Sequence, residues 1–262
     1  MLAAAVSLAI MLPIGIYYGQ PAATIAAATP DPLLITTPTS GPPPVTLGAL
    51  AVAARADTTT GDGPVDHLLL DTWDLHTTIA GQSVTSAGTP TRHELWRDDQ
   101  RALTVDIGPP PATPVHTAYP GGSFPAAFAD RPPTDPDQLA VWLARTSTTG
   151  TAIIDGITDL LRERVLTGPE RAVILSVLAD RTTMAYAGTS TDRIGRRATV
   201  FALPSRSSGA DITHLLLIDP KTGRILATEQ IITGGAHRLD VPYPAVAGYR
   251  TYLQADLVPA IP

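Results

Sequence analysis

The sequence predicts an α+β fold, in which a curved antiparallel sheet packs on central helices after an N-terminal transmembrane helix and a proline-rich linker. Three observations support this prediction. Strand-like stretches come before and after one central block of helical periodicity, the order expected when helices gather on one face of an antiparallel sheet. Hydrophobic residues make up 44% of the 262-residue chain, enough for a sizeable core. The first 20 residues carry no charged side chain.

The N-terminal segment, residues 1–20, reads MLAAAVSLAIMLPIGIYYGQ. About 20 apolar residues suffice to cross a bilayer as a helix, and Tyr17 and Tyr18 suit the membrane interface. A cleaved signal peptide with its cleavage site at residues 26–28 is the alternative. Both types of segment usually follow basic residues, so we expect the natural chain to begin upstream of Met1. We predict a single-span anchor in the cell membrane, with the body on the extracytoplasmic side.

The linker, residues 21–45, is rich in proline, alanine and threonine and has no hydrophobic periodicity. Such a composition favours an extended segment. The extracytoplasmic domain then covers residues 46–262. It should open with a helix, because Leu47, Leu50 and Ala54 recur at helical spacing.

Strands are predicted next. Residues 67–80 are rich in strand-forming side chains, and alternation places Leu69, Trp73 and Leu75 on one face. Residues 93–107 read as a hairpin with its turn at 98–100. Residues 108–133 contain many prolines and are expected to be irregular.

Three helices follow in the prediction. The first begins at Asp135 and Pro136, a capping aspartate followed by proline at the first helical position. The second covers residues 152–165 and presents an apolar stripe, and the third begins at Gly168. Strands then return in five stretches: 185–189, 197–203, 215–218, 225–232 and 249–257.

The stretch from Asp219 to Gly223 reads DPKTG, which is close to the phosphorylated aspartate motif of P-type ion pumps, Asp-Lys-Thr-Gly. A turn between two strands is the alternative. Pro220 at the second turn position and Gly223 at its end match a type I turn closed by a glycine bulge. Asp219 can accept backbone hydrogen bonds across such a turn. We therefore predict that Asp219, Pro220 and Gly223 are structural.

Composition and motifs exclude several function classes. The net charge is −6 and no basic stripe is present, which argues against a nucleic-acid partner. The chain has no cysteine, so disulfides, zinc–thiolate sites and cysteine nucleophiles are excluded. It also lacks a Gly-x-Ser-x-Gly elbow, a His-Glu-x-x-His pair and a phosphate loop. We predict no catalytic residue, no metal ligand and no cofactor.

Two weaker candidates for a site remain. Asp74 and His76 share a strand face, one way to begin a metal site, although a solvated face is the simpler interpretation. Trp73 and Trp96 are candidates for an apolar pocket, with core packing as the alternative. We expect the concave side of the sheet near these tryptophans to face either the helices or an apolar ligand.

Five stretches carry a family resemblance: HELWR, TDPDQLAVWL, LLRERVLTGPERAVILSVLA, DRIGRRATVFAL and LLLIDPKTGRILATEQII. Over residues 46–257 the chain resembles an actinobacterial family of single-span, membrane-anchored extracytoplasmic proteins without an established activity. The resemblance implies an association with extracytoplasmic-function sigma factors and brings no catalytic residues. The predicted fold is similar to the half-barrel of lipoprotein-carrier proteins and of RseB, the periplasmic regulator of an anti-sigma factor.

The function expected from these observations is a non-enzymatic, membrane-anchored extracytoplasmic binding or sensing module linked to envelope or sigma-factor signalling. Its partners would be membrane lipid, through the anchor, and a bound lipid or protein. The alternatives are an envelope lipid-binding protein and a hydrolase whose site is assembled from distant loops that include residues 108–133. Titratable residues clustered in one pocket would favour the enzyme, and a smooth apolar hollow would favour the binding module.

Overall fold

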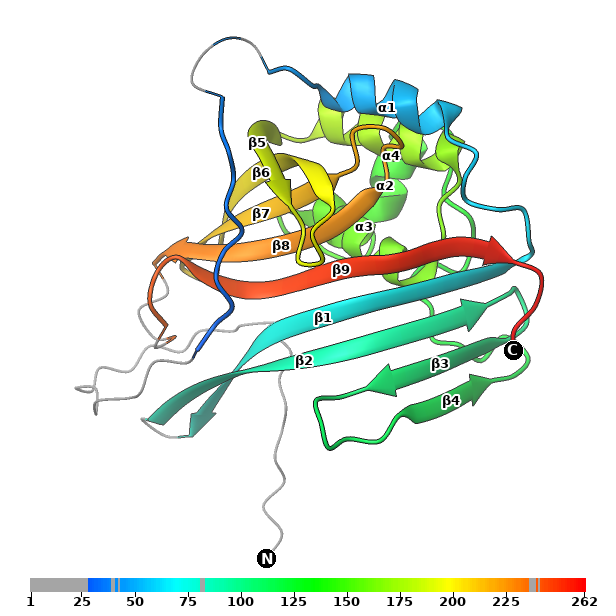
Figure 1. The fold of residues 1–262 in the computed structure, drawn as a ribbon, viewed down its shortest axis with the longest axis horizontal. Coiled ribbons are helices and arrows are strands. Elements are labelled where there is room, and N and C mark those ends of the chain that lie inside the picture. Colours follow the sequence, from blue (N-terminus) through cyan, green and yellow to red (C-terminus); the bar gives the residue numbers. More distant parts are fainter. Residues whose placement is uncertain (1–27, 39–40, 42, 81–82, 236–238, 240) are drawn as a thin grey trace, which may run out of the picture.

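The computed structural model describes residues 28–38, 41, 43–80, 83–235, 239 and 241–262. Over these residues the chain forms one antiparallel sheet of nine strands in the order β4-β3-β2-β1-β9-β8-β7-β6-β5, accompanied by four helices (Figure 1). The predicted α+β class and the antiparallel sheet are confirmed. The transmembrane helix predicted for residues 1–20 lies outside the described residues. None of the helices described is long and apolar enough to span a membrane.

Two of the described helices, α1 and α2, begin at residues whose side chains cap them, and the cap at Asp135 was predicted. The Thr46 side chain accepts a hydrogen bond from the Ala49 N–H at 3.1 Å, and the Asp135 carboxylate accepts one from the Gln138 N–H at 2.9 Å. Each bond satisfies a backbone donor that has no partner within its helix. The four helices are α1 (Leu47–Ala56), α2 (Pro136–Ala144), α3 (Ala152–Glu163) and α4 (Gly168–Arg181).

The strands differ from the prediction at two places. The stretch from His93 to Arg97 is only the end of a much longer strand, β2. A strand also lies within residues 108–133, where an irregular segment was predicted, because Pro114 and Pro120 flank it rather than interrupt it. The strands are β1 (Val65–Ala80), β2 (Ser83–Arg97), β3 (Ala102–Ile107), β4 (Val115–Tyr119), β5 (Ala185–Thr191), β6 (Arg197–Ser207), β7 (Ala210–Ile218), β8 (Ile225–Gly234) and β9 (Ala245–Val258).

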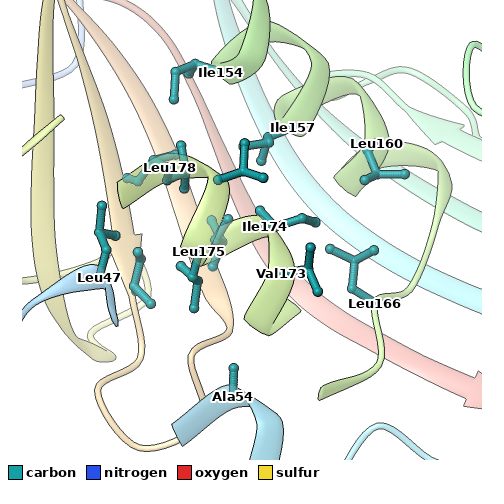
Figure 2. Packing of buried hydrophobic residues seen from close by; sticks show 14 of the residues in the cluster. Leu47, Ala54, Ile154, Ile157, Leu160, Leu166, Val173, Ile174, Leu175 and Leu178 are labelled. Atoms are coloured by element: carbon teal, nitrogen blue, oxygen red, sulfur yellow. The ribbon is translucent and has the colours of Figure 1, made fainter. Parts of the chain in front are cut away.

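The main core lies between the helices and one face of the sheet. Helix α4 runs through its centre, with side chains of α3 on one side and those of α1 on the other (Figure 2). Leu70 of β1 and Leu216 of β7 reach this core from the sheet. Alternation along a strand places their neighbours on the opposite face, which we call the outer face. Leu215 and Leu217 lie there, in a separate cluster.

Part of the predicted linker lies against the sheet. We call residues 31–37 the strap, which appears in blue in Figure 1. Thr36 pairs with Thr189 of the edge strand β5 through two backbone hydrogen bonds of 2.8 and 3.0 Å. Leu33 and Ile35 pack against the outer-face cluster of Leu215. The strap therefore covers the β5 edge of the sheet.

Candidate functional site

The structure places Asp219 in the turn between the antiparallel strands β7 and β8. Its Oδ1 accepts a hydrogen bond from the Lys221 N–H at 2.8 Å, and its Oδ2 accepts one from the Thr222 hydroxyl at 2.9 Å. The Gly223 N–H donates to the Asp219 carbonyl oxygen at 2.9 Å, and Gly223 has a φ of +62°. Both carboxylate oxygens thus hold the Asp219–Gly223 turn that includes Pro220.

Trp73 and Trp96 both lie on the outer face, away from the helices. Trp73 is 6% exposed and stacks on Tyr249, with ring centroids 6.4 Å apart. Trp96 stacks on His67 at 4.7 Å. Trp96 is paired with His67, and Trp73 lies six residues further along β1, which separates the two tryptophans by roughly 20 Å. They pack at different places and do not line a common pocket.

The other candidates also have ordinary partners. Asp74 accepts a hydrogen bond from Arg250 at 3.2 Å, and His76 is exposed. Over the described part of the chain, no three histidine or acidic side chains are grouped so that they could hold a metal ion. Trp142 packs against the main core and lies 4.4 Å from the Phe128 ring.

A polar hollow of about 400 Å³ opens at one end of the sheet. It lies where the β2–β3 turn meets the loop after β4 and the end of α3, and we call it the charged cleft. Its lining brings together segments that are far apart in the sequence. The lining residues are Arg97, Asp98, Asp99, Gln100, Arg101, Gly122, Phe124, Ala126, Ala129, Asp130, Arg131 and Arg164.

Arg97 and Arg164 lie deepest in the charged cleft, with side chains 6% and 4% exposed. Arg97 donates to the carbonyl oxygens of Phe128 and Ala129 at 3.2 and 3.1 Å. Arg164 donates to the Ala129 carbonyl as well, and its Nη1 donates to Asp66 at 2.8 Å. The two guanidinium groups therefore fasten the loop after β4 to the end of the sheet.

Asp66 is the buried carboxylate behind this wall, with a side chain 2% exposed. It accepts hydrogen bonds from Arg164, from Arg131 at 3.2 Å and from the Val165 N–H at 2.8 Å. Arg131 also forms a two-pronged ion pair with Glu170 of α4. A buried charge needs partners of this kind to be tolerated in a protein interior, so Asp66 is the centre of a fixed network.

The rim of the charged cleft is more open. The side chain of Asp99 is 90% exposed and that of Arg101 is 65% exposed. Asp98 holds the β2–β3 turn by accepting hydrogen bonds from the Gln100 and Arg101 N–H groups at 2.8 and 2.6 Å. Asp99 and Arg101 are thus presented to solvent on a turn whose backbone is fixed.

Two pKa shifts reflect this environment. Burial lowers the pKa of Arg97, and repulsion from Arg164 lowers it further. Burial acts to raise the pKa of Asp98, but the hydrogen bonds from the Gln100 and Arg101 backbones, together with the hydrogen bond and charge of the Arg101 guanidinium, outweigh it, so the pKa falls below its usual value. The lining holds four arginines and three aspartates. It therefore presents both signs of charge and suits a polar ligand that also carries both.

The charged cleft was not predicted from the sequence. Arg97, Arg131 and Arg164 come from a strand, a loop and a helix end, and only the fold brings them together. Asp66 comes two residues before the apolar stretch 68–70 of β1, and a lone aspartate in that position gives no sign that it will be buried. The sequence itself clusters only Asp98, Asp99 and Arg101, which share one turn, and the adjacent Asp130 and Arg131.

A second polar pair lies outside the charged cleft, between β6 and β7. The Ser205 hydroxyl is 3.0 Å from Nε2 of His214, which is 7% exposed. Within the described residues, no carboxylate hydrogen-bonds to this imidazole, so the third member that orients a catalytic histidine is missing. Burial lowers the pKa of His214, and the nearby Asp155 opposes this shift.

His214 should therefore make stability depend on pH. The imidazole binds its proton more weakly in the folded chain than in the unfolded chain, whose pKa is about 6.5. Its contribution to stability is complete above that pKa and is lost as the pH falls below it. We expect the His214→Gln variant to lose less stability than the wild type when urea unfolding is compared at pH 7.5 and pH 5.5. Parallel losses in the two proteins would contradict this.

Comparisons with known proteins give little further information. No family model matches the chain, and no curated protein matches it. Among solved structures, a weak likeness links it to a protein described as GphF Dehydratase 1, at 12% sequence identity over 79% of this chain and 81% of that chain. The TM-score is 0.16, so this likeness supports no conclusion about fold or function. The resemblance to the actinobacterial family stays a prediction.

Proposed function

We propose that the protein is a non-enzymatic extracytoplasmic binding or sensing module, anchored to the cell membrane by residues 1–20, and that it holds a protein partner in the charged cleft. The observation that carries this proposal is the construction of the cleft. Its deep arginines are fixed by buried bonds, while Asp99 and Arg101 remain exposed at the rim. Arg101 is ion-paired with Asp98 at 3.0 Å and Asp99 lies 3.8 Å from Arg164, yet both side chains stay largely exposed. A rigid wall with exposed charges of both signs is suited to selecting a partner by electrostatic complementarity.

The polar lining makes a protein segment a better occupant than a lipid chain. Apolar ligands favour pockets lined mainly by hydrophobic and aromatic side chains. Phe124 is the one aromatic residue that the described part of the chain contributes to this lining, and its ring centroid lies 5.2 Å from the Arg97 guanidinium. Trp73 and Trp96, the candidates for an apolar pocket, lie elsewhere on the outer face. These features favour the protein-partner version of the proposal over the lipid-binding one.

An enzyme is the second candidate, because titratable residues do gather in this one cleft. In such an enzyme, Asp99 and Asp130 would serve as the general acid and the general base. Among the described residues of the lining there is no serine, threonine, histidine or lysine side chain to act as a nucleophile or proton carrier. Hydrolysis of chromogenic glycosides or esters that is lost in both Asp99→Asn and Asp130→Asn would support the enzyme and contradict the binding module.

The binding proposal can be tested in intact cells with a photoreactive amino acid at Gln100, an exposed residue of the charged cleft. The matched control carries the same group at Val141, which is 75% exposed on α2. We expect a discrete adduct with one protein from position 100 and none from position 141. Reversing the rim charges, with Arg101→Glu and Asp99→Lys together, should abolish the adduct, because specific recognition depends on matched charge patterns.

Circular dichroism of the charge-reversed protein would verify that the sheet is retained. An adduct that survives charge reversal, or that forms equally from Val141, would contradict the proposal. Native mass spectrometry of the same full-length chain addresses the lipid alternative. Stoichiometric lipid on the purified protein would favour that alternative and would point to a site outside the charged cleft, whose described lining is mainly charged.

A further inference from the structure

The two edges of the described sheet are treated differently. Thr36 of the strap covers the β5 edge, whereas no described strand pairs with the outer side of β4. Natural edge strands usually carry charges, bulges or prolines that prevent pairing with another chain. The five residues of β4, VHTAY, contain no lysine, arginine, acidic residue or proline, and their register with β3 is regular. This edge is open to another strand.

The outward-facing backbone groups of β4 follow from the hydrogen bonds of the neighbouring turn. The Asp98 N–H donates to the Arg101 carbonyl oxygen at 2.9 Å, so the backbone N–H and C=O groups of these two residues are directed toward each other. Those of the next residue, Ala102, are therefore directed away from β2 and toward β4. Backbone direction alternates in antiparallel pairs. With the β3–β4 register, Thr117 bonds inward to β3, while His116 and Ala118 direct their N–H and C=O groups outward.

We propose that β4 pairs with β4 of a second copy of this chain, antiparallel and with the two-fold axis at Thr117. His116 of each copy then faces Ala118 of the other. Each such pair exchanges two backbone hydrogen bonds, because both residues direct their groups outward. The result is one continuous sheet across two copies, a self-complementary arrangement of the kind that a two-fold axis requires.

The flanking prolines support this choice of axis. Pro114 and Pro120 each lie three residues from Thr117. They lie an even number of positions from His116 and Ala118, so their backbone groups face the same outer side of β4. Proline has no N–H to donate, so pairing ends at the same distance on both sides of Thr117. If the register were shifted by two residues, a proline of one copy would lie opposite His116 or Ala118 of the other, and the hydrogen bond from the missing proline N–H would be lost. The centred register loses no such hydrogen bond.

Side chains also match in the centred register. Val115 of one copy faces Tyr119 of the other, and Thr117 faces Thr117. Aromatic with β-branched pairs and threonine pairs both stabilise antiparallel strands. The side chain of Val115 is 59% exposed in the single chain, so this pairing would cover an exposed apolar group. No like charges meet across the axis, since residues 115–119 include no acidic residue, lysine or arginine. These matches favour a second copy over an unrelated strand.

The absence of cysteine allows a direct test with single-cysteine variants of the full-length chain. In the proposed dimer the Thr117 Cα atoms are about 4.5 Å apart, within the range of a disulfide. The Val115 residues of the two copies are offset by four positions and lie roughly 13 Å apart. If disulfides formed only through random collisions, Val115→Cys would cross-link faster than Thr117→Cys, because Val115 is more exposed than Thr117. The proposal requires the opposite order.

We expect Thr117→Cys to form a covalent dimer under mild oxidation about tenfold faster than Val115→Cys, because only the former meets the geometry of a disulfide. Equal rates, or a faster Val115→Cys, would overturn the proposal.

Charge pairs give a second readout that does not depend on oxidation. By sedimentation, Thr117→Lys alone and Thr117→Asp alone should be monomeric, whereas an equimolar mixture should dimerise through the opposite charges at the axis. A mixture that stays monomeric would overturn the proposal as well. Neither measurement involves the charged cleft, so its outcome is independent of the proposed function.

Discussion

Replacing Asp66 with alanine is expected to lower the free energy of unfolding by about 3–5 kcal/mol, as in other cases where one partner of a buried ion pair is removed. The reason is that Asp66 holds Arg164, Arg131 and the Val165 N–H at once. Without the carboxylate, Arg164 keeps its charge in a site where its side chain is 4% exposed. Urea unfolding followed by circular dichroism measures the loss.

Two further variants make this result specific to burial. Asp71 forms an ion pair with Arg92 whose side chains are 32% and 49% exposed, so Asp71→Ala should cost less than about 1 kcal/mol. Combining Asp66→Leu with Arg164→Met removes the buried pair as a unit and should recover part of the stability lost in Asp66→Ala. If Asp66→Ala were no more harmful than Asp71→Ala, the network would not have the structural role assigned to it.

The second large effect is expected for Gly223→Val in the β7–β8 turn. Gly223 has a φ of +62°, and a Cβ atom there would lie 2.6 Å from Cβ of Ala54 and 2.9 Å from the Leu50 carbonyl oxygen. The backbone strain of about 1–2 kcal/mol therefore adds to an overpacking cost of about 1–3 kcal/mol. The turn lies against α1, so the valine would force that helix away from its position. Thermal and urea unfolding both report the change.

Gly195→Val is the matched control, because Gly195 has a φ of +87° and a Cβ there would meet no atom within 4 Å. It should show the backbone strain without the overpacking. Asp219→Asn should cost less than about 1 kcal/mol, since the amide oxygen can still accept the Lys221 N–H. A loss in Gly223→Val equal to that in Gly195→Val would show that contact with α1 contributes nothing.

Local features were the ones that the sequence predicted well. Asp135 caps its helix as predicted, because a cap depends on residues three positions apart. The apolar stripe of α3 is buried at Ile154, Ile157 and Leu160 as predicted, because residues three positions apart lie on one face of a helix. The DPKTG turn is similar, since proline and glycine determine its backbone within five residues.

Features that depend on distant segments were missed. The charged cleft needs the β2–β3 turn, the loop after β4 and the end of α3 to meet, and no spacing in the sequence encodes that meeting. Strand β4 was overlooked because its flanking prolines suggested an irregular segment. The concave side near the tryptophans was expected to face either the helices or an apolar ligand; alternation from Leu70 places Trp73 on the face away from the helices. Periodicity gives two faces but does not say which one the helices cover.

The strap has a consequence for assembly beyond its contacts with the outer face. A sheet with one open edge can add one further copy and then stops, because the symmetric pair consumes both open strands. If β5 were open as well, β4 of each copy could join β5 of the next, and growth would have no natural end. In the proposed dimer, the two backbone hydrogen bonds between Thr36 and Thr189 would therefore limit the assembly to two copies, because they occupy the edge through which further copies would add.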